Sequence, residues 1–106
     1  IRICGTYIGN NEDAIRIEFD PSLFPNKEVL IENCYIESNT GLITILNTKH
    51  KITIRNCVIK GTYNNVKCEN ARPLLTYCFY PSKFHFYNNN MEHTGGIWIV
   101  GDTNHG

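Results

Sequence analysis

The stretch V-L-I-E-N-C-Y-I at residues 29–36 decides the fold, because the chain repeats it as I-T-I-R-N-C-V-I at residues 52–59. This register aligns Ile31 with Ile54 and Cys34 with Cys57. Two weaker copies of the motif begin at Ile1 and Phe84. A motif that recurs along a whole chain is typical of proteins built from similar units stacked on one another. We therefore divide the chain into four units, at about residues 1–27, 28–50, 51–83 and 84–106.

Each unit is expected to contain three short strands, because apolar and polar residues alternate in it over short runs. Between the first two strands, Gly5, Asn33, Asn56 and Asn88 occupy the same place. Gly and Asn are the residues that most readily adopt a left-handed backbone, so a sharp bend is expected there. The third strand of each unit is predicted at residues 15–17, 43–45, 66–68 and 97–99.

The composition limits the possible size, charge and membrane association of the protein but does not assign a function. With 106 residues, of which 42% are hydrophobic, we expect one domain with a core of its own. Ten basic and ten acidic residues balance, so no net field favours a nucleic acid or an anionic membrane. No apolar run approaches the roughly 20 residues of a membrane span, and no signal peptide is found. Because the chain opens inside a repeat and without Met, we expect a fragment of a longer or oligomeric protein.

The five cysteines lack the spacing of a zinc site with the four histidines, so no metal site is expected. Cys34 and Cys57 should face inward in adjacent units, with their Cα atoms about 4.8 Å apart. Parallel side chains at that separation hold their Cβ atoms beyond the roughly 3.8 Å that a disulfide prefers. We therefore expect stacked, reduced thiols, and the cellular compartment stays open.

The links that follow the third strands differ in length, at residues 20–28, 47–51 and 69–83. Insertions at one fixed point of a repeat place long loops on one side, which is often the working side. The apolar segment L-L-T-Y-C-F-Y at residues 74–80 has an alternative interpretation, which we favour. It would be a hydrophobic flap folded onto the wall of the molecule or onto a neighbouring chain.

The repeated I-x-I-x-N-C-x-I, together with G-L-I-T-I at residues 41–45 and G-I-W-I at residues 96–99, resembles the right-handed parallel β-helix of the pectate-lyase-like superfamily. The resemblance implies an all-β solenoid of about four coils, with three short strands per coil and long loops on one side. It also implies an asparagine ladder, formed at the bend by Asn33, Asn56 and Asn88. A leucine-rich repeat is the rival, but it requires leucine where isoleucine dominates here.

In the resembled family, polysaccharide usually lies along the outer face of the strand that precedes the long loops. The resemblance therefore implies a substrate-binding column of Arg16, Thr44, Lys67 and Trp98. Cations suit the carboxylates of an acidic glycan, and an exposed indole suits a sugar face. The alternative is the ordinary mixture of residues on a strand face, with Trp98 packed under a loop or against another subunit.

Catalysis has weaker support, because the clustered aspartates of the family's hydrolases and calcium-binding lyases are missing. We expect no cofactor, although calcium serves some members of the family. Glu18 and Glu69 would lie two units apart, about 9.6 Å at the backbone. That is near the upper limit of the roughly 6.5 to 9.5 Å between the carboxyls of inverting glycosidases. They are the candidate catalytic pair, with ordinary surface charge as the alternative.

We therefore expect a glycan-recognising structural module of a viral or bacterial surface protein, similar to a phage tailspike or fibre. Its expected partners are a polysaccharide and further coils or copies of itself, since tailspikes of this family trimerise and a stack of units needs covered ends. Its expected location is extracellular or on a virion. Two alternatives stay open: a segment of a polysaccharide lyase or glycoside hydrolase, and a purely structural spacer.

Overall fold

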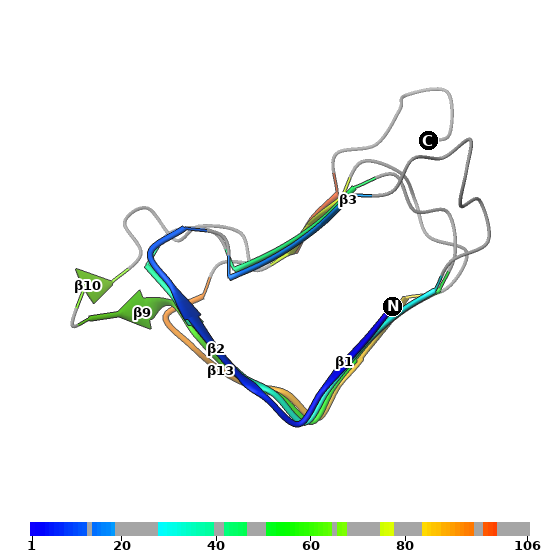
Figure 1. The fold of residues 1–106 in the computed structure, drawn as a ribbon, viewed down its shortest axis with the longest axis horizontal. Coiled ribbons are helices and arrows are strands. Elements are labelled where there is room, and N and C mark those ends of the chain that lie inside the picture. The colour runs from blue at the N-terminus through cyan, green and yellow to red at the C-terminus, as the bar shows by residue number, and fades with distance from the viewer. Residues whose placement is uncertain are drawn as a thin grey trace.

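The computed structural model describes residues 1–12, 14–18, 28–39, 42–46, 51–64, 66–67, 75–77, 84–94 and 97–99. All regular structure in these residues is β-strand, which confirms the all-β prediction (Figure 1). Within the same residues, no helix has the length and hydrophobicity needed to cross a membrane.

Three parallel sheets of four strands each make up most of the described chain. The first sheet has the order β1 (Arg2–Cys4), β4 (Val29–Glu32), β7 (Ile52–Arg55) and β12 (Phe84–Tyr87). The second has the order β2 (Tyr7–Asn10), β5 (Tyr35–Ser38), β8 (Val58–Lys60) and β13 (Asn90–Glu92). The third has the order β3 (Ile15–Glu18), β6 (Ile43–Leu46), β11 (Leu75–Tyr77) and β14 (Ile97–Ile99). Each unit thus gives one strand to each sheet, and the sheets face a common interior (Figure 1).

The register predicted from the repeated motif is confirmed. Ile31 pairs with Ile54 across β4 and β7, and Ile36 pairs with Ile59 across β5 and β8. All four side chains are fully buried. The weaker copies align as expected too, because Ile3 pairs with Ile31 and Phe86 pairs with Ile54. The interior is therefore built of files of apolar side chains that run from unit to unit.

The predicted bend between the first two sheets is also confirmed. Gly5 has a φ of 63°, and Asn33, Asn56 and Asn88 each have a φ of 55°. Backbone hydrogen bonds join the bends of successive units, from Gly5 N to Glu32 O and from Asn33 N to Arg55 O, both at 3.2 Å. The bends therefore stack in register, at the vertex where β1 meets β2 (Figure 1).

Within the described residues, the asparagine ladder predicted at these bends is not found. Asn33, Asn56 and Asn88 are exposed, and no hydrogen bond within the described residues links their amide groups. A left-handed residue at an outer vertex turns its side chain away from the interior. The left-handed backbone conformation is thus sufficient to explain why asparagine recurs at the bend.

The third strand of the third unit was predicted wrongly. Val66–Lys67 form β10, which pairs antiparallel with β9 (Thr62–Tyr63) in a hairpin. The place in the third sheet is taken by β11, which pairs with β6 and β14. Leu75–Tyr77 are therefore a strand of the sheet, and the prediction of a hydrophobic flap at residues 74–80 is wrong for them.

We expect replacement of Asn56 by alanine to lower the free energy of unfolding by about 1 kcal/mol, because only the left-handed backbone penalty is incurred. Replacement of Asn56 by glycine should cost less, since glycine adopts positive φ freely. Urea denaturation of the two variants beside the parent checks this. Equal losses for alanine and glycine would show that the amide, and not the backbone, stabilises the bend.

Candidate functional site

The residues predicted to bind a glycan lie on the third sheet, with one exception. Arg16 pairs with Thr44, and Thr76 stands between Thr44 and Trp98. Lys67 lies in β10 instead, so Thr76 replaces it in the column. Arg16 is exposed and Thr44 is half-buried. Three of the four predicted residues therefore share one row of backbone positions.

The candidate catalytic pair is not assembled in the described residues. Glu18 is exposed at the end of β3, and its pairing partner in β6 is Leu46. Glu69 lies outside the described residues. The register that aligned it with Glu18 depended on Val66–Lys67 belonging to the third sheet, which they do not.

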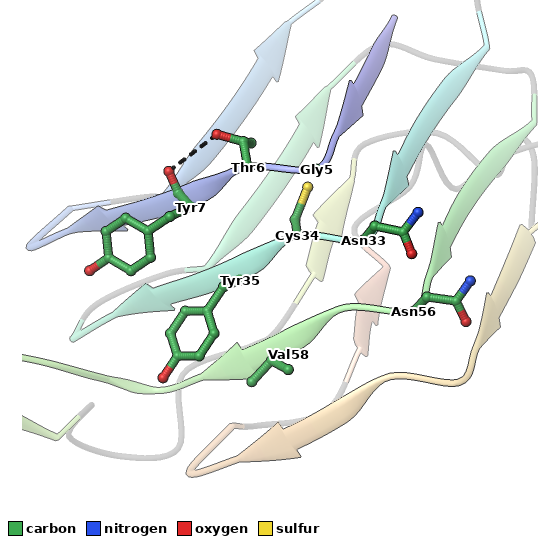
Figure 2. A pocket seen from close by; sticks show the side chains of 8 residues that line it. All are labelled: Gly5, Thr6, Tyr7, Asn33, Cys34, Tyr35, Asn56 and Val58. Carbon is green, nitrogen blue, oxygen red and sulfur yellow. Dashed lines mark hydrogen bonds between the residues drawn. The ribbon is translucent and has the colours of Figure 1, made fainter.

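A shallow, wide-open groove of about 450 Å³ lies over the stacked bends and the adjoining start of the second sheet (Figure 2). Its lining comes from the first three units, from the bend itself and from the residues that follow the bend into the second sheet. The residues are Gly5, Thr6, Tyr7, Asn33, Cys34, Tyr35, Asn56 and Val58. None of these side chains carries a charge at neutral pH, and two are aromatic.

Two tyrosines from successive units form one wall of the groove. Tyr7 and Tyr35 are paired in register on β2 and β5. Their ring centroids are 5.7 Å apart with the planes tilted by 30°, an offset arrangement that aromatic rings favour. Tyr7 is 58% exposed, and Tyr35 is half-buried. The next position in the file is Val58, which extends the apolar strip into the third unit.

Charged neighbours outside the groove hold the tyrosine rings in place. The Tyr7 hydroxyl donates a hydrogen bond to the Glu37 carboxylate. This bond is the main cause that raises the pKa of Tyr7 to about 12, so the phenol stays neutral past its usual pKa near 10. Lys60 Nζ lies 5.4 Å from the centroid of the Tyr35 ring, within range of a cation–π contact.

Gly9 leaves room for this arrangement. It is the residue of β2 that pairs with Glu37. A Cβ at position 9 would collide with the Tyr7 hydroxyl and would lie 2.6 Å from the ring of Tyr63. The absence of a side chain at Gly9 therefore lets Tyr7 lie across the strand and reach Glu37.

The other wall of the groove carries amide groups. Asn33 and Asn56 are exposed, and Figure 2 shows their side chains on the opposite side of the bend from the tyrosine rings. Among the described residues, neither amide has a hydrogen-bond partner. Each amide can donate two hydrogen bonds and accept two, so both retain this capacity for a ligand.

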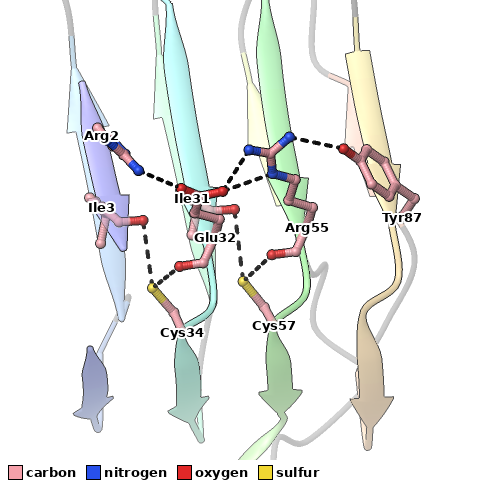
Figure 3. Close-up of polar contacts among 8 residues, drawn as sticks. All are labelled: Arg2, Ile3, Ile31, Glu32, Cys34, Arg55, Cys57 and Tyr87. Atoms are coloured by element: carbon pink, nitrogen blue, oxygen red, sulfur yellow. Dashed lines mark hydrogen bonds and ion pairs between the residues drawn. The ribbon is translucent and has the colours of Figure 1, made fainter. Parts of the chain in front are cut away.

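The inward side of the bend carries a ladder one residue later than predicted (Figure 3). The Cys34 thiol contacts Glu32 O at 3.2 Å and Ile3 O of the preceding unit at 3.6 Å. Cys57 repeats this with Arg55 O at 3.3 Å and Ile31 O at 3.8 Å. Both thiols are buried and free, as predicted, and burial raises the pKa of Cys57.

In the fourth unit, Asn89 takes the place of the cysteine. Its amide nitrogen donates to Ile54 O at 3.0 Å, and its amide oxygen accepts from the backbone N–H of Cys57 at 3.0 Å. The acceptor Ile54 O is the counterpart of Ile31 O and Ile3 O in the earlier units. The side-chain ladder is thus formed by Cys34, Cys57 and Asn89.

On the outer face of the first sheet, Glu32 joins three units (Figure 3). Its carboxylate accepts from Arg2 at 2.8 Å and from Arg55 Nε at 2.8 Å, and Arg55 also donates to the Tyr87 hydroxyl at 3.1 Å. The Glu32 side chain is only 9% exposed. The hydrogen bonds from Arg2 and Arg55 lower its pKa below the usual 4.5.

Stability should therefore depend on the ionisation of Glu32. Because its pKa is lower in the folded state, the ion pairs stabilise the fold above about pH 4.5 and lose this effect as the pH falls through the folded-state value. We expect Glu32→Gln to unfold at a lower urea concentration than the parent at pH 7. The two proteins should converge only as the pH falls through the lowered folded-state pKa of Glu32. A difference in stability that stays constant down to the pH at which Glu32 of the folded protein is protonated would contradict this role.

Sequence reasoning missed the groove, although part of its signal was visible. Tyr7 and Tyr35 occupy equivalent outward positions, and Asn33 and Asn56 recur at the bend. No pattern in the sequence indicated that one groove would include both pairs of residues. No cluster of three or more potential metal ligands occurs among the described residues.

Comparisons with protein-family models, with curated proteins and with solved structures find no match for this chain.

Proposed function

We propose that the chain is a glycan-recognising structural module, built as a right-handed parallel β-helix of about four coils. The stacked parallel sheets and their unit-to-unit register support this architecture. The end strands β1 and β12 have no second neighbour within the described part of the first sheet, and Ile1 and Met91 are 51% and 46% exposed. Further coils or neighbouring chains would cover such ends, as expected for a piece of a fibre-like protein.

The observation that carries the proposed function is the groove with two tyrosine rings beside two asparagine amides. An aromatic ring presents an electron-rich face, which attracts the weakly positive C–H groups on the flat side of a sugar. Amides donate to and accept from hydroxyl groups. Because the lining comes from three successive units, the groove suits an extended saccharide better than a compact small molecule.

The experiment is a binding measurement with immobilised polysaccharides and the purified chain. Tyr35→Ala should weaken retention about tenfold, which corresponds to about 1.4 kcal/mol. Tyr87→Ala is the matched control, because Tyr87 is an exposed tyrosine on the outer face of the first sheet. It should bind like the parent.

The predicted column on the third sheet provides the competing location. If Arg16→Ala and Trp98→Ala abolish retention while Tyr35→Ala does not, the glycan lies on the third sheet and not in the groove. A lack of retention on every polysaccharide tested would leave the purely structural spacer as the better description.

A further inference from the structure

We infer that the groove takes a neutral saccharide chain, lying along the stacking direction across the first three units. This inference rests on the proposed function and narrows it, because the third-sheet column had predicted an acidic glycan. The lining carries no cationic side chain that could pair with a sugar carboxylate. The Asn33 and Asn56 amides would compensate the desolvation of a sugar carboxylate less fully than a cationic side chain would.

The charges nearest to the tyrosine wall also disfavour an acidic ligand. The Glu37 carboxylate holds the hydroxyl of Tyr7, so a negative charge lies at the edge of the wall. Lys60 is directed to other partners, since it lies over the Tyr35 ring and 4.0 Å from the Glu92 carboxylate. A neutral saccharide needs no cation from the described lining of the groove, and the Glu37 carboxylate does not repel it.

The tyrosine wall is arranged before any ligand arrives. Glu37 fixes the tilt of the Tyr7 ring through its hydroxyl, and Gly9 keeps the space that this ring crosses. Binding therefore does not have to order the Tyr7 side chain, which lowers the entropic cost of binding. Glu37 and Gly9 act as positioning residues, because neither lines the groove itself.

The opposite wall spaces its hydrogen-bonding groups by the repeat of the units. Asn33 and Asn56 stand one unit apart, about 4.8 Å along the stack. Both residues have a φ of 55°, so their side chains leave the backbone in equivalent directions and place donors and acceptors one unit apart. Gly5 continues this row in the first unit with the same left-handed backbone but without an amide.

The first experiment compares neutral and acidic probes on one protein. Cello-, malto- and manno-oligosaccharides serve as the neutral probes, and oligogalacturonate serves as the acidic one, each measured by calorimetry. We expect a neutral probe to bind with an affinity that changes less than twofold, by rough estimate, between about 0.05 and 0.5 M salt. Oligogalacturonate should bind more weakly than that neutral probe.

The second experiment separates the amides from the bend that they form. The double variant Asn33→Gly/Asn56→Gly keeps residues that adopt positive φ and removes only the amides. Its unfolding midpoint in urea should stay near that of the parent, while its Kd for the neutral probe rises about tenfold. Gly5→Asn should lower that Kd about threefold, since an added Cβ meets nothing within 4 Å and the new amide lengthens the row.

The outcomes distinguish a failure of the neutral-ligand inference from a failure of the proposed glycan recognition. Binding of oligogalacturonate alone would overturn the neutral ligand and leave glycan recognition intact. Binding of no probe of either class would overturn the proposed function itself. If the neutral probe still binds both Tyr35→Ala and the double glycine variant with the parent's affinity, the saccharide lies elsewhere on the surface of the protein.

Discussion

Ile54→Ala is expected to lower the free energy of unfolding by about 3 to 4 kcal/mol, within the range measured for large-to-small changes in closed cores. Ile54 has no exposed surface and is paired with Ile31 on one side and with Phe86 on the other. Its removal opens a gap in the middle of the file, where β4 and β12 are held apart by the backbone ladder. Equilibrium unfolding in urea, followed by circular dichroism, measures the loss.

The matched control for Ile54 lies in the same file. Ile3 precedes Ile31 and is only half-buried, because it belongs to the first unit. Ile3→Ala should cost about 1 kcal/mol, since it removes little buried area and leaves an open notch instead of a closed cavity. If Ile3→Ala and Ile54→Ala lower the free energy of unfolding by similar amounts, Ile54 is not packed more tightly than Ile3, and this prediction is wrong.

Asn89→Ala is expected to cost about 2 kcal/mol, because it leaves two backbone groups without their partners. These are the Cys57 N–H and the Ile54 carbonyl, both of which the Asn89 amide contacts at 3.0 Å. Asn89 also links the fourth unit to the third, so its loss should loosen β12 and β13 first. Amide hydrogen exchange at Phe86 and Met91 would report that loosening.

Two neighbouring asparagines serve as controls for Asn89. Asn88→Gly keeps the positive φ of the bend and should be close to neutral. Asn90 is exposed, and Asn90→Ala should change stability by less than about 0.5 kcal/mol. A cost at Asn89 no larger than that at Asn90 would mean that the inward amide does not stabilise the fourth unit.

The sequence was sufficient to predict the first two sheets, since their signal is local and repeated. The alternation around Ile31 and Ile54 defines which side faces inward, and one shared register then pairs every unit. The bend was equally predictable, because few residues adopt positive φ at Asn33 and Asn56 without strain. Both features depend on residues that lie close together in each unit.

The third unit could not be placed by the same reasoning, because spacing alone cannot show where a strand pairs. Val66 follows Ile59 by the interval that places Ile43 after Ile36, yet the chain turns back at Asn64, which has a φ of 51°. Asn64-Asn65 between Tyr63 and Val66 is the composition of a tight hairpin turn. That local signal competed with the periodicity and determined the structure.

The groove was unpredictable for a different reason: it combines bend residues and second-sheet residues from three units. Its lining depends on how these units stack on one another, and no single stretch encodes that stacking. The ladder was misplaced by one position, since Cys34 and Cys57 were interpreted only as apolar filler. Their carbonyl contacts show that a thiol can occupy the same position as the Asn89 amide.

The direction of the hydrogen bonds in the three sheets has a mechanical consequence. In the described parts of the three sheets, the backbone hydrogen bonds between units run along the stacking direction, because neighbouring strands of each sheet come from successive units. A pull on one terminus along that direction would therefore separate the units one after another. Such a pull would act first on an end unit, while the fully buried isoleucines Ile31 and Ile54 lie in the two middle units.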